Sequence, residues 1–184
     1  MIEPGLLLTR ALFVVLAGAA WLFWARHRSP ERLDTAAMLS SLALPVLTEE
    51  LIRLGTDERW MQTTGSIGLM LHPLLLLRMI WHFRPVLPAV NIIAVAGSVA
   101  SVGVLLWWPL PLSEPLTAAL TVWFMALEAL AAMWLLLGGL RARGVTRWRM
   151  LLIGSGSVLL AGIIGLAGLS PSVQTSSRSS TPPA

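Results

Sequence analysis

The sequence predicts an all-α integral membrane protein, a bundle of six transmembrane helices with short loops and its N-terminus outside. Two observations support this fold class. Of the 184 residues, 56% are hydrophobic and only 12% are charged, which excludes an ordinary soluble domain. Apolar runs of about 20 residues, the length that a helix needs to cross a bilayer, recur between short polar or proline-containing joints. The predicted spans are residues 5–25, 35–54, 61–82, 89–108, 116–140 and 150–169.

The first two runs differ in character. Residues 5–25 lack a basic start and are too long for the core of a signal peptide, which indicates an uncleaved helix. A basic joint, residues 26–34, follows. The second run keeps its helical pattern through charged residues near its end. Glu49 and Arg53 are four positions apart and Glu50 and Arg53 three, so these side chains can pair along one helix face.

Three residue types stand out inside the middle runs. The third run has His72 at its centre. Its end carries a basic, aromatic cluster, as expected where a helix leaves through the headgroups: Arg78, Trp81, His82 and Arg84. The fifth run carries Glu128 at its midpoint. Pro45 in the second run and Pro73 in the third are expected to interrupt their helices.

Small residues recur at helical spacing in the fourth and sixth runs. Gly97 and Ser101 are four positions apart, as are Ser157, Ala161 and Gly165. In lipid, such spacing lets helix backbones approach closely. The sequence therefore predicts helix-packing ridges at these positions.

The arginines predict the orientation. Nine of them lie at the first, third and fifth joints and four on the other side, which makes the first side cytoplasmic by the positive-inside rule. Both ends of the chain should then lie outside, and the polar tail, residues 171–184, is expected to be disordered. We expect a multi-pass protein of a bacterial inner membrane. The pI near 11.5 reflects these loops, so no nucleic acid is expected as a partner.

Hairpin geometry predicts a charged outer layer. In an antiparallel hairpin, residues equidistant from the turn lie at the same depth. Folding the first hairpin about residue 30 places Arg10 opposite Glu50, in a layer that also holds Glu49 and Arg53. This cluster is either a charge-balanced helix cap or a ligand site.

The same geometry brings His72, Ser98 and Glu128 to one level near the midplane. Ionisable residues at such depth are costly and usually face the bundle interior or a water-filled cavity. Glu128 could be a carboxyl held for packing, and His72 an imidazole bonded to a serine or to a carbonyl freed by Pro73. A His72–Glu128 pair with Ser98 beside it would suit a packing contact, a proton relay or a ligand contact.

Several kinds of chemistry find no support in the sequence. There is no cysteine, so disulfides, thiolate metal ligands and cysteine nucleophiles are excluded. His27 and His82 lie at the predicted cytoplasmic edge, far from His72, which argues against bis-histidine haem. No metal-ligand spacing and no nucleophile–base motif appears. We therefore expect no cofactor, no metal and no enzymatic activity.

The segment from Leu71 to Val86, LHPLLLLRMIWHFRPV, resembles the N-terminal multi-helix membrane regions of bacterial sensor histidine kinases and related membrane signalling proteins. There, a leucine-rich run, an arginine and an HFRPV-like exit lead into a cytoplasmic loop. The likeness extends in helix order over residues 5–169 and implies a sensory input role. Such regions commonly have seven helices, whereas this sequence predicts six spans and ends at Ala184 with no kinase or cyclase domain.

Two function classes follow. The first is a non-enzymatic membrane sensing module, in which the polar intramembrane residues receive the stimulus and the basic loops meet a partner. The alternative is a small transporter or permease with a proton or substrate path through Glu128 and His72. Transporters often contain inverted repeats, and none is evident here, which favours sensing. The expected partners are the lipid bilayer and either a cytoplasmic signalling protein or a second copy of the chain.

Overall fold

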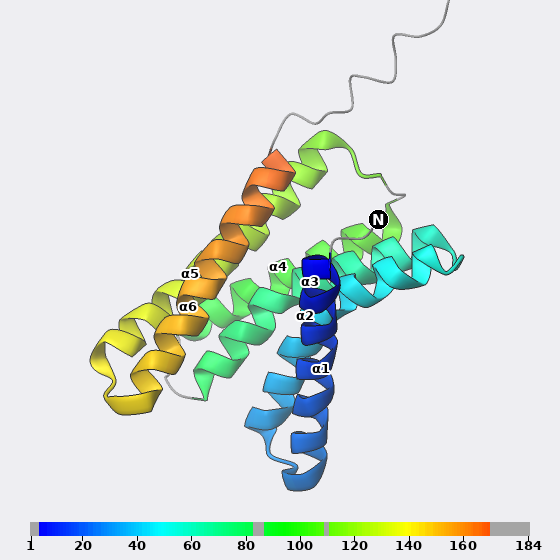
Figure 1. Cartoon of the computed structure of the whole chain (residues 1–184). Coiled ribbons are helices and arrows are strands. Elements are labelled where there is room, and N and C mark those ends of the chain that lie inside the picture. The colour runs from blue at the N-terminus through cyan, green and yellow to red at the C-terminus, as the bar shows by residue number, and fades with distance from the viewer. Residues whose placement is uncertain (1–3, 83–86, 109–110, 170–184) are drawn as a thin grey trace, which may run out of the picture.

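The computed structural model describes residues 4–82, 87–108 and 111–169, and over these residues the protein is all-α (Figure 1). This confirms the predicted fold class. The predicted disordered tail, residues 171–184, lies outside the described residues, as do the last residues of the HFRPV exit. The helices are α1 (Pro4–His27), α2 (Pro30–Arg53), α3 (Glu58–Trp81), α4 (Pro88–Trp107), α5 (Glu114–Arg141) and α6 (Gly144–Leu169).

Helix length and surface chemistry both identify a multi-pass membrane protein. Among the described residues, the helices α2 to α6 are long and apolar enough to cross a bilayer. α1 is also long enough, at 24 residues, and remains a predicted span. Large apolar side chains are exposed along the outer faces, such as Ile92 and Val99 on α4 and Leu159 and Ile163 on α6. Faces of this kind would be unstable in water and are stable against lipid.

Two joints are shorter than the sequence suggested. The helices extend into the predicted joint at residues 26–34, because α1 runs to His27 and α2 begins at Pro30. Ser29 caps α2, its hydroxyl accepting from the backbone N–H of Arg32 at 3.4 Å, and proline is well suited to a first helical position. The sixth helix likewise begins at Gly144 rather than at residue 150. The basic residues of these joints thus lie on the ends of the helices.

The prolines do not interrupt their helices, contrary to the prediction. α2 continues through Pro45 and α3 through Pro73. A proline removes one backbone donor, and in a membrane helix neighbouring side chains can compensate for the local loss. Near Pro45, the Thr48 hydroxyl shares its one hydrogen between the carbonyls of Leu44 and Pro45, each 3.0 Å away. It adds a hydrogen bond beside the proline but does not replace the one lost at the Ser41 carbonyl.

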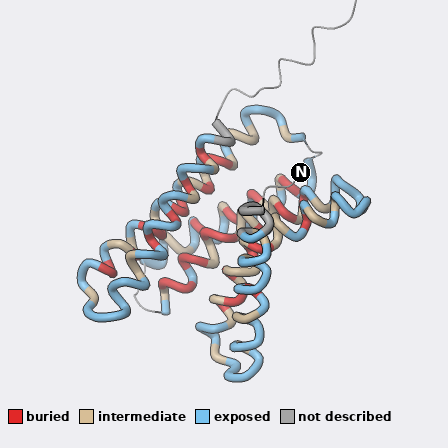
Figure 2. The backbone as a smooth tube through the Cα atoms, viewed as in Figure 1, coloured by how far each residue is buried: buried red, intermediate tan, exposed pale blue. Residues whose placement is uncertain are grey.

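α3 is the central helix. Within the described residues it packs against α2, α4 and α5, while α1 packs only on α2 and α6 only on α5. Figure 1 shows the α1–α2 hairpin and the α5–α6 hairpin extending from different sides of α3. Buried positions follow the faces that α2, α3 and α5 turn inward (Figure 2). The core cluster consists of Met38, Leu76, Leu77, Met79, Ile80, Ala94, Leu127, Ala131 and Leu135.

Small residues hold the helices close, and this confirms the predicted ridge on α6. Ser157, Ala161 and Gly165 are all buried, and a Cβ on Gly165 would lie 2.6 Å from the Met125 sulfur of α5. On α4, the small residue Gly97 accommodates a side chain rather than a helix backbone. The Trp123 ring of α5 covers Gly97, where a Cβ would lie 2.0 Å from the ring, so the glycine there makes room for an aromatic side chain.

Candidate functional site

The structure brings His72 of α3 and Glu128 of α5 together. Nε2 of His72 lies 3.7 Å from Oε1 of Glu128. Glu128 is fully buried and His72 is 4% exposed, so neither side chain faces lipid. The distance is longer than a hydrogen bond, but a rotamer adjustment of under an ångström would form one. The pair crosses the interface between α3 and α5.

Ser41 of α2 fixes the orientation of the imidazole. Its hydroxyl donates to the carbonyl of Met38 at 2.6 Å and lies 3.1 Å from Nδ1 of His72. A serine hydroxyl has one hydrogen, so with that hydrogen on Met38 it accepts from Nδ1–H. In the neutral imidazole the other ring nitrogen, Nε2, then has a free lone pair directed toward Glu128. This tautomer makes His72 a proton acceptor at the atom nearest the carboxyl group.

The carboxyl group of Glu128 has few hydrogen-bonding neighbours. Ser157 of α6 lies within reach of it, yet within the described part of the chain neither carboxyl oxygen has a hydrogen-bond partner of good geometry. Ser98 on α4 is fully buried, but its hydroxyl also has no hydrogen-bond partner among the residues that the structure describes. The expected place of Ser98 beside the pair is therefore not supported by a hydrogen bond. Ser41 and Ser157 are the serines that approach His72 and Glu128.

The charged outer cluster forms between α1 and α2. Arg10 donates to Glu49 at 2.7 Å and forms a short contact with Glu50, and its side chain is only 11% exposed. Arg53 lies 2.9 Å from Glu49 and 3.4 Å from Glu50. The predicted pairing of Arg10 with Glu50 is confirmed. Two arginines balance two carboxylates, and this neutral set ties the start of α1 to the end of α2.

A third cluster lies at the opposite end of the α2–α3 hairpin and was not predicted. The buried carboxylate of Asp34 accepts from Nε of Arg78 at 2.9 Å and lies 2.7 Å from Nε2 of His82. The sequence contained a signal for it. Folding the second hairpin about residue 57 places Asp34 level with residue 80, between its two partners. Arg78 and His82 had been assigned only to the headgroup region.

The three clusters lie at successive depths along α2. Asp34 and Ser41 are seven residues apart, which is about 10 Å along a helix, and Glu49 lies about 12 Å further on. Asp34, Ser41 and Thr48 repeat at intervals of seven and are all buried, so they share the face that meets α3. Polar groups thus occur at both ends and in the middle of the α2–α3 contact.

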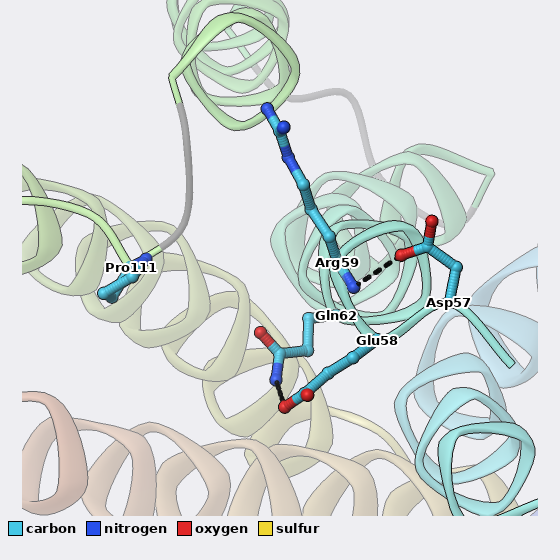
Figure 3. A pocket seen from close by; sticks show the side chains of 5 residues that line it. All are labelled: Asp57, Glu58, Arg59, Gln62 and Pro111. Carbon is cyan, nitrogen blue, oxygen red and sulfur yellow. Dashed lines mark hydrogen bonds between the residues drawn. The ribbon is translucent and has the colours of Figure 1, made fainter. Parts of the chain in front are cut away.

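Two of the pockets on the surface of the described residues are well defined, and neither is lined by His72 or Glu128. The first, of about 620 Å³, is lined by Asp57, Glu58, Arg59, Gln62 and Pro111 (Figure 3). Its polar groups are mostly engaged, because Asp57 accepts from the backbone N–H groups of Arg59 and Trp60 and Gln62 donates to Glu58. The second is a groove between α1 and α2. No group of three or more possible metal ligands occurs among the residues that the structure describes.

Comparison of the chain with protein-family models, with curated proteins and with solved structures finds no match. The resemblance to sensor histidine kinase membrane regions is thus not supported by an identified family. Over the residues that the structure describes, the observations establish an all-helical protein with five candidate membrane spans, and its contact with a lipid bilayer follows from those spans.

Proposed function

We propose that this protein is a non-enzymatic membrane sensing module in which the His72–Glu128 pair is the contact that responds to the stimulus. The observation that carries the proposal is the position of the pair, at 3.7 Å, between α3 and α5. α3 supports the α1–α2 hairpin, and α5 supports α6. A change in this contact therefore alters how one hairpin sits against the other.

The chemistry of the pair suits a switch. With Nδ1–H held by Ser41, a proton on Glu128 can be shared with Nε2 of His72 or transferred to it. Transfer or loss of that proton converts a neutral contact into a charged one, and charges at such depth are costly unless paired. The carboxylates of the two end clusters, Glu49 and Asp34 among them, are already engaged in ion pairs. The midplane pair is therefore the contact most free to change.

The readout would be the basic end of the α5–α6 hairpin. Arg141, Arg143, Arg147 and Arg149 gather there, on the side that the arginine distribution predicts to be cytoplasmic. A cytoplasmic signalling partner, or a second copy of the chain, would detect movement of this end. The sensor-kinase resemblance of the segment from Leu71 to Val86 supports the same direction of signalling, inward through α3.

Spin labels on the two hairpins test the proposal. The chain has no cysteine, so Glu31→Cys at the start of α2 and Arg143→Cys after α5 give two defined labels. In liposomes, the label-to-label distance distribution should differ between about pH 5 and about pH 8, because the charge on a coupled pair changes with pH. With Glu128→Gln added, the distribution should no longer respond. An unchanged distribution in the parent, or an equal shift in both proteins, would contradict the proposal.

A small proton-linked transporter is the second candidate, because polar contacts of α2 recur at three depths: Arg10–Glu50, Ser41–His72 and Asp34–His82. Liposomes containing a pH-sensitive dye distinguish the two functions. A transporter would collapse an imposed proton gradient, and Glu128→Gln would abolish that flux. With a sensing module, the proton gradient would decay no faster than in empty liposomes.

A further inference from the structure

The groove between α1 and α2 has the chemistry of a lipid site. It holds about 390 Å³. Five of its lining residues are apolar: Leu16, Ala19, Ala20, Phe23 and Leu39. The remaining two, Arg32 and Thr35, both lie on the first turns of α2. The groove is thus apolar along its length with a cation at one end.

The polar end lies where a headgroup would lie. Arg32 follows the α1–α2 turn at Arg28 and Ser29, so it is at the end of the hairpin. Leu16 is twelve residues from Arg28 along α1, or about 18 Å deeper. One leaflet of the hydrocarbon core is about 15 Å thick, half of the bilayer value. The groove therefore matches an acyl chain in depth, with its cation at the interface.

The cation is available for binding. Arg32 is exposed, and in the part of the chain that the structure describes its guanidinium has no hydrogen-bond or ion-pair partner. The nearby carboxylate of Asp34 is buried and engaged by Arg78 and His82. Glu31 does not line the groove. The Thr35 hydroxyl already donates to the Glu31 carbonyl at 2.9 Å, so the guanidinium is the donor that remains.

We infer that this groove binds an anionic phospholipid, with one acyl chain along the apolar residues and the phosphate on Arg32. Arginine forms strong paired hydrogen bonds with phosphate oxygens. Basic pockets between membrane helices are a known way of holding anionic headgroups. A zwitterionic lipid carries a compensating cation and gains less from Arg32. The site does not involve the His72–Glu128 pair, so it stands independently of the proposed function.

Binding to purified protein in detergent tests the headgroup contact. Phosphatidylglycerol should raise the melting temperature and give lipid-bound species by native mass spectrometry, and phosphatidylcholine should do so much less. Arg32→Gln should weaken phosphatidylglycerol binding about tenfold, as for loss of one charge-assisted hydrogen bond. The Ser29 cap uses the backbone of Arg32, so this variant keeps the helix start. Arg143→Gln removes an exposed arginine of the other hairpin and should bind normally.

A second pair of variants tests the acyl-chain contact. Ala20→Trp fills the groove and should reduce phosphatidylglycerol binding although Arg32 is present. Gly18→Trp adds the same bulk to α1 at a position with nothing within 4 Å, and should leave binding unchanged. Soluble glycerol phosphate, which has the headgroup without the chains, should not stabilise the protein.

Equal weakening by Arg32→Gln and Arg143→Gln would show attraction to overall charge and overturn the proposal. It would also be overturned by equal binding of the two lipids, by full stabilisation with glycerol phosphate, or by normal binding to a folded Ala20→Trp protein. If Ala20→Trp does not fold, the comparison of Arg32→Gln with Arg143→Gln decides the outcome.

Discussion

Nε2 of His72 lies 3.7 Å from Oε1 of Glu128, and this contact joins α3 to α5 in the interior of the protein. It is held on one side by Ser41, which accepts from Nδ1 of the imidazole. On the other side Ser157 approaches the carboxyl group from α6. Four helices therefore meet around one ionisable pair. The contacts outside this pair should affect the stability of the protein, whereas the pair itself should govern its response, so each can be tested with its own variants.

The outer charge cluster should behave as a coupled unit. Arg10→Ala leaves Glu49 and Glu50 with only Arg53 as a partner, so the melting temperature in detergent should fall. Adding Glu50→Gln removes one unpaired charge and should recover part of the loss. A double-mutant cycle measures this coupling. Strictly additive losses would mean that the charges act independently.

The Asp34 cluster should contribute more than an ordinary surface charge. Asp34→Asn keeps the volume but weakens the contacts with Arg78 and His82, at a cost of about 1.5–3 kcal/mol for hydrogen bonds to a charged group. Glu31→Gln, on the same helix but exposed, is the matched control. Its free energy of unfolding should be within about 0.5 kcal/mol of that of the parent. Similar unfolding free energies for both variants would show that the Asp34 contacts add no net stability.

Added bulk should disrupt the α5–α6 interface at Gly154 and be tolerated at Gly156, which lies outside that interface. A Cβ on Gly154 would lie 3.0 Å from Cγ of Leu136, whereas one on Gly156 would have nothing within 4 Å. Gly154→Leu should therefore separate the helices and lower the melting temperature, while Gly156→Leu should face lipid and have little effect. Equal melting temperatures would indicate that α5 and α6 do not pack in this way.

The orientation is predicted by the arginines and can be tested directly. Reporter tags at either end of the chain should be accessible from outside, and a tag inserted near Arg143 should be accessible from the cytoplasm. A cytoplasmic signal from a C-terminal tag would mean an odd number of spans.

The fold was largely predictable because the membrane imposes a simple rule. Apolar runs of about 20 residues become helices, since a helix satisfies all of its backbone hydrogen bonds within the one segment and lipid supplies none. The helix ends were less predictable. Pro30 and Gly144 begin helices within segments that looked like polar loops, because basic residues at the interface can extend a helix beyond the hydrocarbon core.

The contacts of the site were only partly predictable. Depth matching correctly aligned Arg10 with Glu50, and it set His72 and Glu128 at one level. Depth does not determine rotation about a helix axis, however, so it could not show that Ser41 rather than Ser98 bonds to His72. The Asp34 cluster was missed because Asp34 was placed in a loop, when it is in fact on the first turns of α2.

Infrared difference spectroscopy between low and high pH tests the central claim most directly, since it detects the protonated carboxyl group of Glu128 itself. We expect a carboxyl band that disappears in Glu128→Gln, changes in His72→Gln because the two groups titrate as a pair, and persists in Asp34→Asn. Such a result would establish a proton shared between α3 and α5. A spectrum in which no carboxyl band depends on Glu128, or in which its band is indifferent to His72, would contradict the account.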